Sequence, residues 1–371
     1  MRCIVYKYKI ATTRLLQKLK LNSIAYNISK LFTGNDLLDL DVESCRKLLN
    51  EYSPKPDGTT DGKNNIHEYE YDLQINVAVY NNQEYTRKCM ETLANQKTKY
   101  KYICYVVDDG SKDDSYYIVD EFKDHPNFVI IHQDNKGLPG SRNTGLKDIY
   151  ARYVMLMDGD DYLSEDAVEK LMDYAIKNDA DIVDGSYISV VNDKYIYCQS
   201  KQGPCDYLSL SGFSWMKVIK SEIFENIRFP ENYWFEDTTM SFLVYPLAEK
   251  MYRISDYIYY HNLNKKGLVS IAKGASKSID TYWISELLND RRMKDNYPVD
   301  MNYWNLLKRQ FAMNYKRIYL LPENIKQAIF VLERELLKEV FPDKMNDDEF
   351  MSYIYDGNYK RYNLYAYWNY L

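Results

Sequence analysis

From residue 72 onward, continuous apolar runs alternate with stretches in which apolar residues recur every three or four positions. The runs are DLQINVAVY, YKYICYVVDD, NFVIIHQDN and YVMLMDGDD, and they read as strands. The intervening stretches, EYTRKCMETLANQ, DDSYYIVDEFKDH and SRNTGLKDIY, read as helices. Strands without polar alternation, separated by helices, are typical of a parallel sheet with both faces covered. The sequence therefore predicts an α/β domain, to which we assign residues 71–275.

The flanking regions follow other patterns. Residues 51–68, EYSPKPDGTTDGKNNIHE, are polar with two prolines and two glycines, and predict a linker that ends an N-terminal extension at residue 70. Residues 276–371 contain three stretches of helical period and predict a small C-terminal helical domain. Its last residues, YKRYNLYAYWNYL, are dense in tyrosine. They would either seal that helical bundle or present an aromatic surface to an acceptor or to another subunit, which would make a homo-oligomer.

The N-terminal extension is strongly basic. Residues 1–35 hold seven Lys and Arg and no Asp or Glu, and because the whole chain carries −6, the remainder carries −13. An acidic body argues against nucleic acid as a partner. Five apolar residues, Leu21, Ile24, Ile28, Leu31 and Phe32, would share one face of a helix. That face could lie on an anionic membrane or pack on the protein itself, and both uses remain open.

Two observations address the cellular compartment. The six cysteines are scattered without a CxxC pair, which fits a reducing compartment. No run of eighteen apolar residues occurs, and the N-terminus lacks the features of a secretory signal. We therefore expect a cytoplasmic protein, with peripheral contact to the inner face of the plasma membrane if residues 1–35 bind lipid.

Three aspartates follow the fourth apolar run. Asp158, Asp160 and Asp161 would repel one another unless a cation came between them. Asp158 and Asp160 have the DxD form, with Gly159 expected to let the backbone turn between them. Mg²⁺ or Mn²⁺ held by few carboxylates completes its shell with phosphate oxygens, so the predicted ligand is a nucleoside diphosphate. The alternative is an ordinary loop that precedes a helix capped by Ser164.

Polar and aromatic residues also follow the first two apolar runs. Tyr80 and Asn82 follow the first run, and Asp108 and Asp109 end the second. Ligands bind beyond the carboxyl ends of the strands in such sheets, so we expect these four residues at a nucleotide site. Tyr80 offers an aromatic face, and a carboxylate can accept the N3 hydrogen of a uracil-like base. For Asp108 a turn that caps the next helix is an equal alternative.

The segments VAVYNN, VVDDGSKDDS, NKGLPGSRNTGL, MDGDDYLSED and FPENYWFEDTTMSF, in this order, resemble the family 2 glycosyltransferases of GT-A fold. The resemblance covers about residues 72–270. It implies a mostly parallel, Rossmann-like sheet with helices on both faces. It also implies an inverting enzyme that moves a sugar from a nucleotide-sugar, usually a UDP-sugar, onto an acceptor hydroxyl.

The resemblance assigns roles to individual residues. It places the nucleoside at Tyr80 and Asp109, the base or phosphate at Arg142, and Mn²⁺ or Mg²⁺ at Asp160 with Asp158 close by. Arg142 has a planar fork that suits phosphate or a base edge, and its alternative role is a surface ion pair.

The resemblance also assigns residues to the acceptor side of the site. Inversion needs a base that takes the proton of the acceptor hydroxyl, and the resemblance assigns this role to Asp237, with Glu236 binding the acceptor or orienting the loop. Asp237 could also cap the helix that follows it. GFSWMKVIKSEIF places Trp215 and Lys217 at the acceptor, with core burial as the competing role of Trp215. His261 is a candidate metal or diphosphate ligand or a structural histidine.

The sequence therefore predicts a metal-dependent hexosyl- or N-acetylhexosaminyltransferase that builds a bacterial surface glycan on a glycan, lipid-linked or glycoprotein acceptor. Two rival functions are considered. A sugar-1-phosphate nucleotidyltransferase would need a glycine-rich loop with a basic residue, which VAVYNNQEY lacks. A non-catalytic glycan-binding scaffold would have no need of the DxD carboxylates and the Glu236–Asp237 pair.

Overall fold

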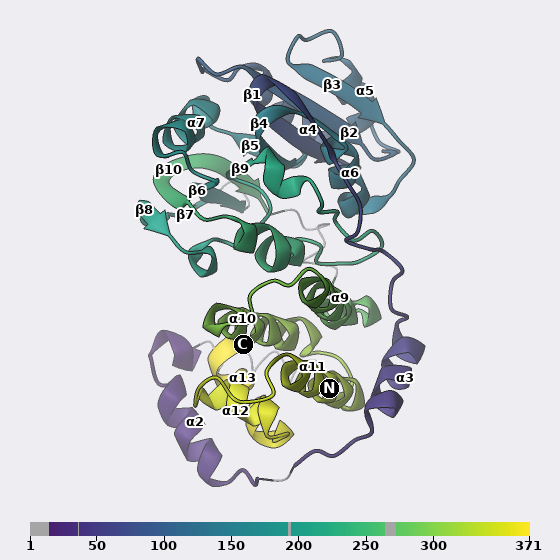
Figure 1. Ribbon diagram of the computed structural model, residues 1–371, viewed down its shortest axis with the longest axis vertical. Coiled ribbons are helices and arrows are strands. Elements are labelled where there is room, and N and C mark those ends of the chain that lie inside the picture. Colours follow the sequence, from purple (N-terminus) through teal and green to yellow (C-terminus); the bar gives the residue numbers. More distant parts are fainter. Residues whose placement is uncertain (1–14, 36, 192–193, 264–271) are drawn as a thin grey trace. The chain divides into compact units, whose positions relative to one another are not determined.

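The computed structural model describes residues 15–35, 37–191, 194–263 and 272–371 (Figure 1). The chain forms two compact units. One, the α/β unit, comprises Pro56–Ser270 and Leu287–Tyr297. The other, the helical unit, comprises Met1–Lys55, Ile271–Glu286 and Pro298–Leu371. This corrects the three-part division predicted from sequence, because the N-terminal extension folds together with the C-terminal helices. Arg2, Lys7, Lys9 and Arg14 of the basic extension lie outside the described residues.

The predicted parallel strands form one half of a mixed sheet. Its order is β3-β2-β1-β4-β9-β6-β10-β5, and β7 and β8 pair with β6 and β10. In the first half, β1 (Asn65–Val79), β2 (Tyr102–Asp108), β3 (Phe128–His132) and β4 (Asp148–Asp158) are parallel. The helices between these strands are α4 (Gln83–Ala94), α5 (Ser115–Asp120) and α6 (Gly137–Leu146). The apolar runs thus correctly predicted these four strands and their parallel direction.

The second half of the sheet contains both parallel and antiparallel pairs. β6 (Ile182–Val191) and β10 (Met251–Asn262) are parallel, and β9 (Lys217–Lys220) joins β6 to β4 by antiparallel pairing on both sides. The strands β5 (Tyr162–Leu163), β7 (Lys194–Cys198) and β8 (Gly203–Cys205) are short and antiparallel to their partners. Helix α7 (Ala167–Asn178) connects β5 to β6.

Two strands are longer than the sequence pattern predicted. β1 already begins at Asn65, inside the segment expected to be a linker, and its register to β4 shifts between Ile66 and Tyr71. β4 begins at Asp148, within the stretch SRNTGLKDIY that was expected to be helical to its end. In both places pairing between β1 and β4 extends strands whose residues alone do not alternate cleanly. The linker is therefore shorter than the predicted segment, residues 51–68.

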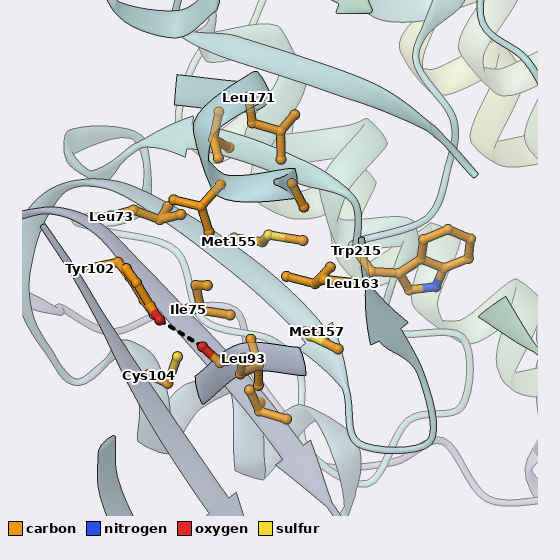
Figure 2. Close-up of a cluster of buried hydrophobic side chains, with 14 of the residues drawn as sticks. Leu73, Ile75, Leu93, Tyr102, Cys104, Met155, Met157, Leu163, Leu171 and Trp215 are labelled. Carbon is orange, nitrogen blue, oxygen red and sulfur yellow. Dashed lines mark hydrogen bonds between the residues drawn. The ribbon is translucent and has the colours of Figure 1, made fainter. Parts of the chain in front are cut away.

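The core of the α/β unit lies between the sheet and its helices. Leu73 and Ile75 of β1 and Met155 and Met157 of β4 pack there with Leu171 of α7 (Figure 2). The hydroxyl of Tyr102 donates a hydrogen bond of 2.7 Å to the carbonyl oxygen of Leu93, so this buried polar group is satisfied (Figure 2). Cys104 is buried in the same cluster.

The helical unit is all-helical in its described part. It contains α2 (Asn22–Leu31), α3 (Val42–Tyr52), the first turns of α9 (Asp280–Lys294), α10 (Met301–Ile318), α11 (Glu323–Val340), α12 (Glu349–Tyr355) and α13 (Tyr359–Tyr370). The short 3₁₀-helix Ser276–Ile279 precedes α9. Tyr359, Tyr362 and Ala366 of α13 are buried, so these C-terminal residues seal the bundle, one of the two predicted roles. Among the described residues, no helix has the length and apolar content that spanning a membrane requires.

The N-terminal helix α2 contacts its own unit through one side only. The hydroxyl of the buried Tyr26 donates to Glu349 Oε1 at 2.7 Å and lies 3.1 Å from the hydroxyl of Tyr353. Lys30 pairs with the same Glu349. The apolar face predicted from sequence is directed elsewhere, with Ile24, Ile28, Leu31 and Phe32 between 54% and 86% exposed. The helix is therefore packed on the protein while its aliphatic face stays open.

Candidate active site

The carboxyl ends of three parallel strands are level with one another, as the sequence predicted. In the register of the sheet, Val79 of β1 pairs with Asp108 of β2, and Ala78 pairs with Asp158 of β4. The backbone N–H of Gly159 donates to Ala78 O at 2.8 Å, and that of Asp109 donates to Val79 O at 2.9 Å. The polar residues that follow these strands therefore gather at one edge of the sheet.

The turn after β4 requires a glycine for reasons of space. A Cβ on Gly159 would lie 2.7 Å from both Ala78 O and Val79 Cγ2, closer than atoms can approach without a shift. The sequence had attributed this glycine to turn geometry, but its φ is not in the left-handed region. Gly159 instead lets the aspartate turn pack directly on β1, which fixes the position of Asp158 and Asp160.

The third aspartate of the turn has a structural role. Asp161 is buried, and its carboxylate accepts hydrogen bonds from Tyr259 Oη at 2.7 Å and from Asn262 N at 2.8 Å. Asn262 also donates through Nδ2 to Asp160 O at 2.6 Å. Burial, and then the charges of Asp160 and Asp158, raise the pKa of Asp161 well above its usual value. Asp161 therefore anchors the turn to β10, while Asp158 and Asp160 remain partly exposed.

Arg142 joins the aspartate turn to the segment that carries the predicted base. Its side chain, 4% exposed, extends from α6, and Nη2 lies 3.0 Å from Asp158 Oδ1 while Nη1 lies 2.5 Å from Glu236 Oε1. Burial opposes the charge of Arg142, but Asp158, Glu236 and Asp237 outweigh it, so its pKa is raised. The alternative role as a surface ion pair is excluded by this burial. Arg142 is the buried cation around which three carboxylates assemble.

Glu236 and Asp237 differ in environment although they are neighbours in sequence. Glu236 is 4% exposed, and burial raises the pKa of its carboxyl to about 7 against the opposing effect of Arg142. Asp237 is partly exposed. Phe235, just before them, has φ +66°, a conformation that costs a non-glycine residue energy and that is enriched at functional sites. The following segment is a π-helix, Met240–Val244, and not the regular helix expected.

The predicted nucleoside residues lie at the ends of β1 and β2. Tyr80 is 46% exposed, and Asn82 immediately precedes α4. The carboxylate of Asp108 is buried, lies 3.0 Å from His132 Nδ1 and accepts from Ser111 N at 3.2 Å. Asp108 therefore forms the turn that was its alternative role, and its position corrects the expected contact with a ligand.

Asp109 is also nearly inaccessible, with 2% of its surface exposed. Its Oδ1 accepts hydrogen bonds from Gln133 Nε2 at 2.7 Å and from Lys136 N at 2.9 Å. Burial raises the pKa of Asp109, and these hydrogen bonds oppose the rise. Asp109 thus holds the start of α6 against β2. A base reaches this carboxylate only if the loop at residues 133–136 shifts.

Trp215 lies in the core and not at an open surface. It is 4% exposed and stacks on Phe213 at 4.4 Å, on Tyr259 at 4.6 Å and on His261 at 4.9 Å between ring centroids. Figure 2 shows it at the border of the buried cluster. Core burial, the competing role of Trp215, is therefore the observed one. Phe213, 37% exposed, presents the outer aromatic face of this stack, and no sequence motif pointed to this residue.

Lys217 is a buried structural cation. Its side chain is 0% exposed, and Nζ lies 3.1 Å from Asp184 Oδ1. Nζ also donates to Ser211 Oγ at 2.7 Å and to Phe213 O at 2.9 Å. Burial lowers the pKa of Lys217, and Asp184 opposes this. These contacts correct the expected role at the acceptor, because Lys217 supports the segment that carries Phe213 and Trp215 and does not reach a ligand.

The predicted metal ligands are Asp158, Asp160 and His261. Among the described residues, no three His, Cys, Asp or Glu side chains form a ready-made metal cluster. Burial lowers the pKa of His261 against the effect of Asp158, so this imidazole is neutral near pH 7, but its ring is stacked on Trp215. Asp158 and Asp160 offer two hard carboxylates. The residues fit a divalent cation that takes its remaining ligands from phosphate and water, as Mg²⁺ commonly does.

One cleft in the α/β unit lies apart from the site described above. It has a volume of about 570 Å³ and is lined by residues such as Tyr69, Arg152, Lys220 and Glu222. Lys220 pairs there with Asp179 and Asp181. None of the candidate site residues lines this cleft. The pairing of Lys220 with two carboxylates is an arrangement common on solvated surfaces.

Comparisons with known proteins agree with this geometry. Residues 75–242 match the model of glycosyl transferase family 2. The glycosyltransferase GlyA of Streptococcus pneumoniae is 31% identical over 217 residues, which are 53% of this chain and 31% of GlyA. The poly(ribitol-phosphate) beta-glucosyltransferase of Bacillus spizizenii is 26% identical over 53% of this chain and 33% of that protein. The chain thus spans about a third of the length of these two relatives. Its residues 75–242 form a glycosyl transferase family 2 domain.

A solved structure supports the fold. The crystal structure of S. aureus TarS 1–349 in complex with UDP-GlcNAc superimposes with a TM-score of 0.52 over 79% of this chain and 89% of that one, at 17% identity. The likeness confirms the predicted GT-A fold with a C-terminal helical region.

Proposed function

We propose that the protein is an inverting glycosyltransferase that moves a sugar from a UDP-sugar to an acceptor hydroxyl. The observation that carries the proposal is the assembly of Asp158, Glu236 and Asp237 around Arg142 at the carboxyl ends of the parallel strands. The family 2 domain and the TarS likeness, with UDP-GlcNAc bound to that protein, support the donor class.

The residues divide the chemistry between them. The partly exposed Asp237 takes the proton of the acceptor hydroxyl as its oxygen attacks the anomeric carbon on the face opposite the diphosphate. Glu236 is held by Arg142 and orients the segment that carries Asp237. Phe213 offers an aromatic face to a sugar ring. Tyr80 and Asn82 would bind the nucleoside, and Asp109 would join them once the loop at residues 133–136 has shifted.

Asp160 and Asp158 would hold Mn²⁺ or Mg²⁺, with His261 as a further candidate. When bound, the cation would neutralise charge that develops on the departing diphosphate. Arg142 already contacts Asp158, so part of the charge of this carboxylate is balanced by the protein. We therefore assign Asp160 as the principal ligand.

The transferred group is a hexosyl or N-acetylhexosaminyl unit, and the product is part of a bacterial surface glycan such as a teichoic acid, capsule or exopolysaccharide. The relative named poly(ribitol-phosphate) beta-glucosyltransferase supports this class of product. The rival functions predict different behaviour. A nucleotidyltransferase would need a nucleoside triphosphate, and a non-catalytic scaffold would not turn over a nucleotide-sugar.

Residues 1–35 provide peripheral contact with an anionic membrane surface at the cytoplasmic face. The support is the exposed aliphatic face of α2, which Tyr26 leaves free by packing on the opposite side, together with the lysines and arginines of this segment. Basic residues near such a surface contribute about 1 kcal/mol each.

A direct experiment tests the proposed function. Purified protein is incubated with Mn²⁺ and each of a panel of nucleotide-sugars, and release of the nucleoside diphosphate is measured with and without candidate acceptor glycans. The proposal predicts release from one or a few UDP-sugars, stimulated by an acceptor and abolished by EDTA. Release from no nucleotide-sugar would contradict it, and pyrophosphate formation from UTP and a sugar phosphate would indicate the nucleotidyltransferase.

A further inference from the structure

A row of tyrosines crosses the second half of the sheet in the α/β unit. Tyr162 of β5 pairs with Tyr260 of β10, Tyr260 pairs with Ile188 of β6, and Ile188 pairs with Tyr197 of β7. Residues directly opposite each other on neighbouring strands point to the same face of a sheet. Tyr195 lies two positions from Tyr197 and so shares this face. Figure 1 shows β6, β7 and β10 beside one another.

The rings of this row are in contact, and the outer ones are open to solvent. Tyr162 and Tyr260 stack at 4.4 Å with 9° between their planes, and Lys88 Nζ lies 3.5 Å from the Tyr162 ring centroid. Tyr197 meets Tyr257 edge-on at 5.3 Å. Tyr195 and Tyr197 are 54% and 63% exposed. We call Tyr162, Tyr195, Tyr197, Tyr257 and Tyr260 the tyrosine surface.

The tyrosine surface is adjacent along β5 and β10 to residues of the candidate active site. Tyr162 directly follows Asp161, and Tyr260 lies between Tyr259 and His261, whose side chains stack on Trp215 on the other face of the sheet. Asp161 is bound by Tyr259 and by Asn262 of the same strand. The surface therefore begins one residue from the aspartate turn, and a chain bound there could pass around the end of β5 and β10 to the acceptor side.

The side chains of the tyrosine surface indicate whether it suits a sugar chain, a lipid or a second copy of the protein. Phenol rings offer flat apolar faces with a polar tip, which match the C–H faces and hydroxyl groups of sugars. An aliphatic composition would suit lipid, but Ile196, the exposed aliphatic residue of β7, alternates with Tyr195 and Tyr197 and so points to the opposite face. β7 has five residues and begins with a lysine, and short, charged edge strands protect against pairing with a second copy.

We propose that the tyrosine surface is a binding site for the glycan acceptor, at a distance of several sugar units from the reacting hydroxyl. The inference rests on the proposed function, which leaves the acceptor unassigned. It adds that the acceptor is an extended glycan chain and not a single sugar. Residues of the surface act on acceptor affinity and have no part in binding the nucleotide.

Tyr197 of the tyrosine surface can be compared with Tyr117, an exposed tyrosine elsewhere in the same unit, as a control. Tyr197 is 63% exposed and meets Tyr257 edge-on at 5.3 Å and 74°. Tyr117 of α5 is 68% exposed and meets Tyr116 edge-on at 5.3 Å and 78°. Tyr197→Ser and Tyr117→Ser therefore remove the same group from equivalent surroundings in the same unit, and neither side chain supports the core.

The test measures binding of the wild type and both variants to an array of bacterial surface polysaccharides and oligosaccharides of increasing length. The proposal predicts that the wild type binds a long glycan, that Tyr197→Ser weakens this binding by on the order of tenfold, and that Tyr117→Ser does not. No glycan binding by the wild type, or equal binding by all three proteins, would overturn it.

Two further measurements exclude other occupants. If Tyr197→Ser alters the oligomeric state seen by light scattering, or abolishes binding to phosphatidylglycerol vesicles, the surface binds a second copy or lipid and the proposal is wrong. Titration of the wild type with UDP and Mn²⁺ tests the proposed function separately. Nucleotide binding without glycan binding would overturn only the acceptor site, and glycan binding without nucleotide binding would overturn only the transferase.

Discussion

Arg142 and Glu236 form a buried ion pair, with Nη1 and Oε1 2.5 Å apart and both side chains at most 6% exposed. The two residues are 94 positions apart in the chain. The same guanidinium reaches Asp158 at the end of β4. One cation thus ties together the DxD turn and the segment that presents Asp237, so the relative position of donor-side and acceptor-side carboxylates depends on Arg142.

Replacing Arg142 should therefore destabilise the fold. Arg142→Ala leaves the charges of Asp158, Glu236 and Asp237 without their buried partner, and breaking a buried pair in this way costs about 3–5 kcal/mol. The measurement is the free energy of unfolding in urea. Addition of Glu236→Gln to the variant should recover part of the loss, because one uncompensated charge is removed. A loss below about 1 kcal/mol would mean that the pair does not hold the site together.

Asp160→Asn should remove a charged metal ligand. Turnover is expected to be lost, and affinity for UDP should no longer depend on Mn²⁺. Calorimetric titration with UDP in Mn²⁺ and in EDTA measures this directly. Asp114→Asn, at an exposed aspartate of the same unit, is the control and should behave as wild type. Full activity of Asp160→Asn, or of the wild type in EDTA, would refute the metal assignment.

The helical unit should lose stability at alkaline pH because of Glu333. This side chain is fully buried, its Oε1 accepts from Asn314 Nδ2 at 2.8 Å, and burial raises its pKa from 4.5 to about 8. A carboxyl with a raised pKa stabilises the fold below its unfolded pKa, and this contribution is lost as the pH rises through about 8.

Thermal unfolding between pH 6 and pH 9 checks this expectation. The wild type should lose up to roughly 3 kcal/mol over this range, whereas Glu333→Gln, which keeps the acceptor for Asn314, should lose less. Glu339→Gln, at an exposed position of the same helix, should follow the wild type. Identical pH profiles for all three proteins would show that Glu333 does not titrate in this range.

The open face of α2 should bind anionic vesicles. Ile28→Ser combined with Phe32→Ser removes two side chains that are 54% and 86% exposed, so the helix should stay docked through Tyr26. Co-sedimentation with phosphatidylglycerol vesicles should weaken by on the order of tenfold or more. Leu320→Ser, at a leucine 49% exposed in the same unit, is the control. Loss of soluble activity or aggregation of the double variant would instead indicate a packed structural face.

The elements that could be predicted from sequence are those set by local pattern. The parallel strands β1 to β4 and the helices α10 and α11 follow from apolar runs and helical periodicity. The aspartate turn was predicted because all its residues are adjacent in the chain. The contact that holds α2 on the helical unit was not predicted, because Tyr26 and Glu349 meet only in the folded unit.

The errors at the site have the same cause. Lys217 was placed at the acceptor because the segment GFSWMKVIKSEIF resembles the family, and no residue near it in the sequence indicates that it pairs with Asp184. Trp215 was likewise left between two roles until Phe213, Tyr259 and His261 were found stacked on it. A signal for Lys217 did exist, since Asp184 is a charged residue within the otherwise apolar start of β6.

The proposed mechanism depends most on Asp237, and one kinetic comparison tests the role of this residue as the base. Asp237→Asn removes the proposed base but keeps the size of the side chain, so the variant should bind the UDP-sugar as the wild type does while kcat falls on the order of a hundredfold or more. The measurement is steady-state transfer to acceptor, with nucleotide-sugar affinity determined separately by calorimetry. Unchanged kcat, or loss of nucleotide-sugar binding together with rate, would contradict the assignment of Asp237 as the base of a glycosyltransferase.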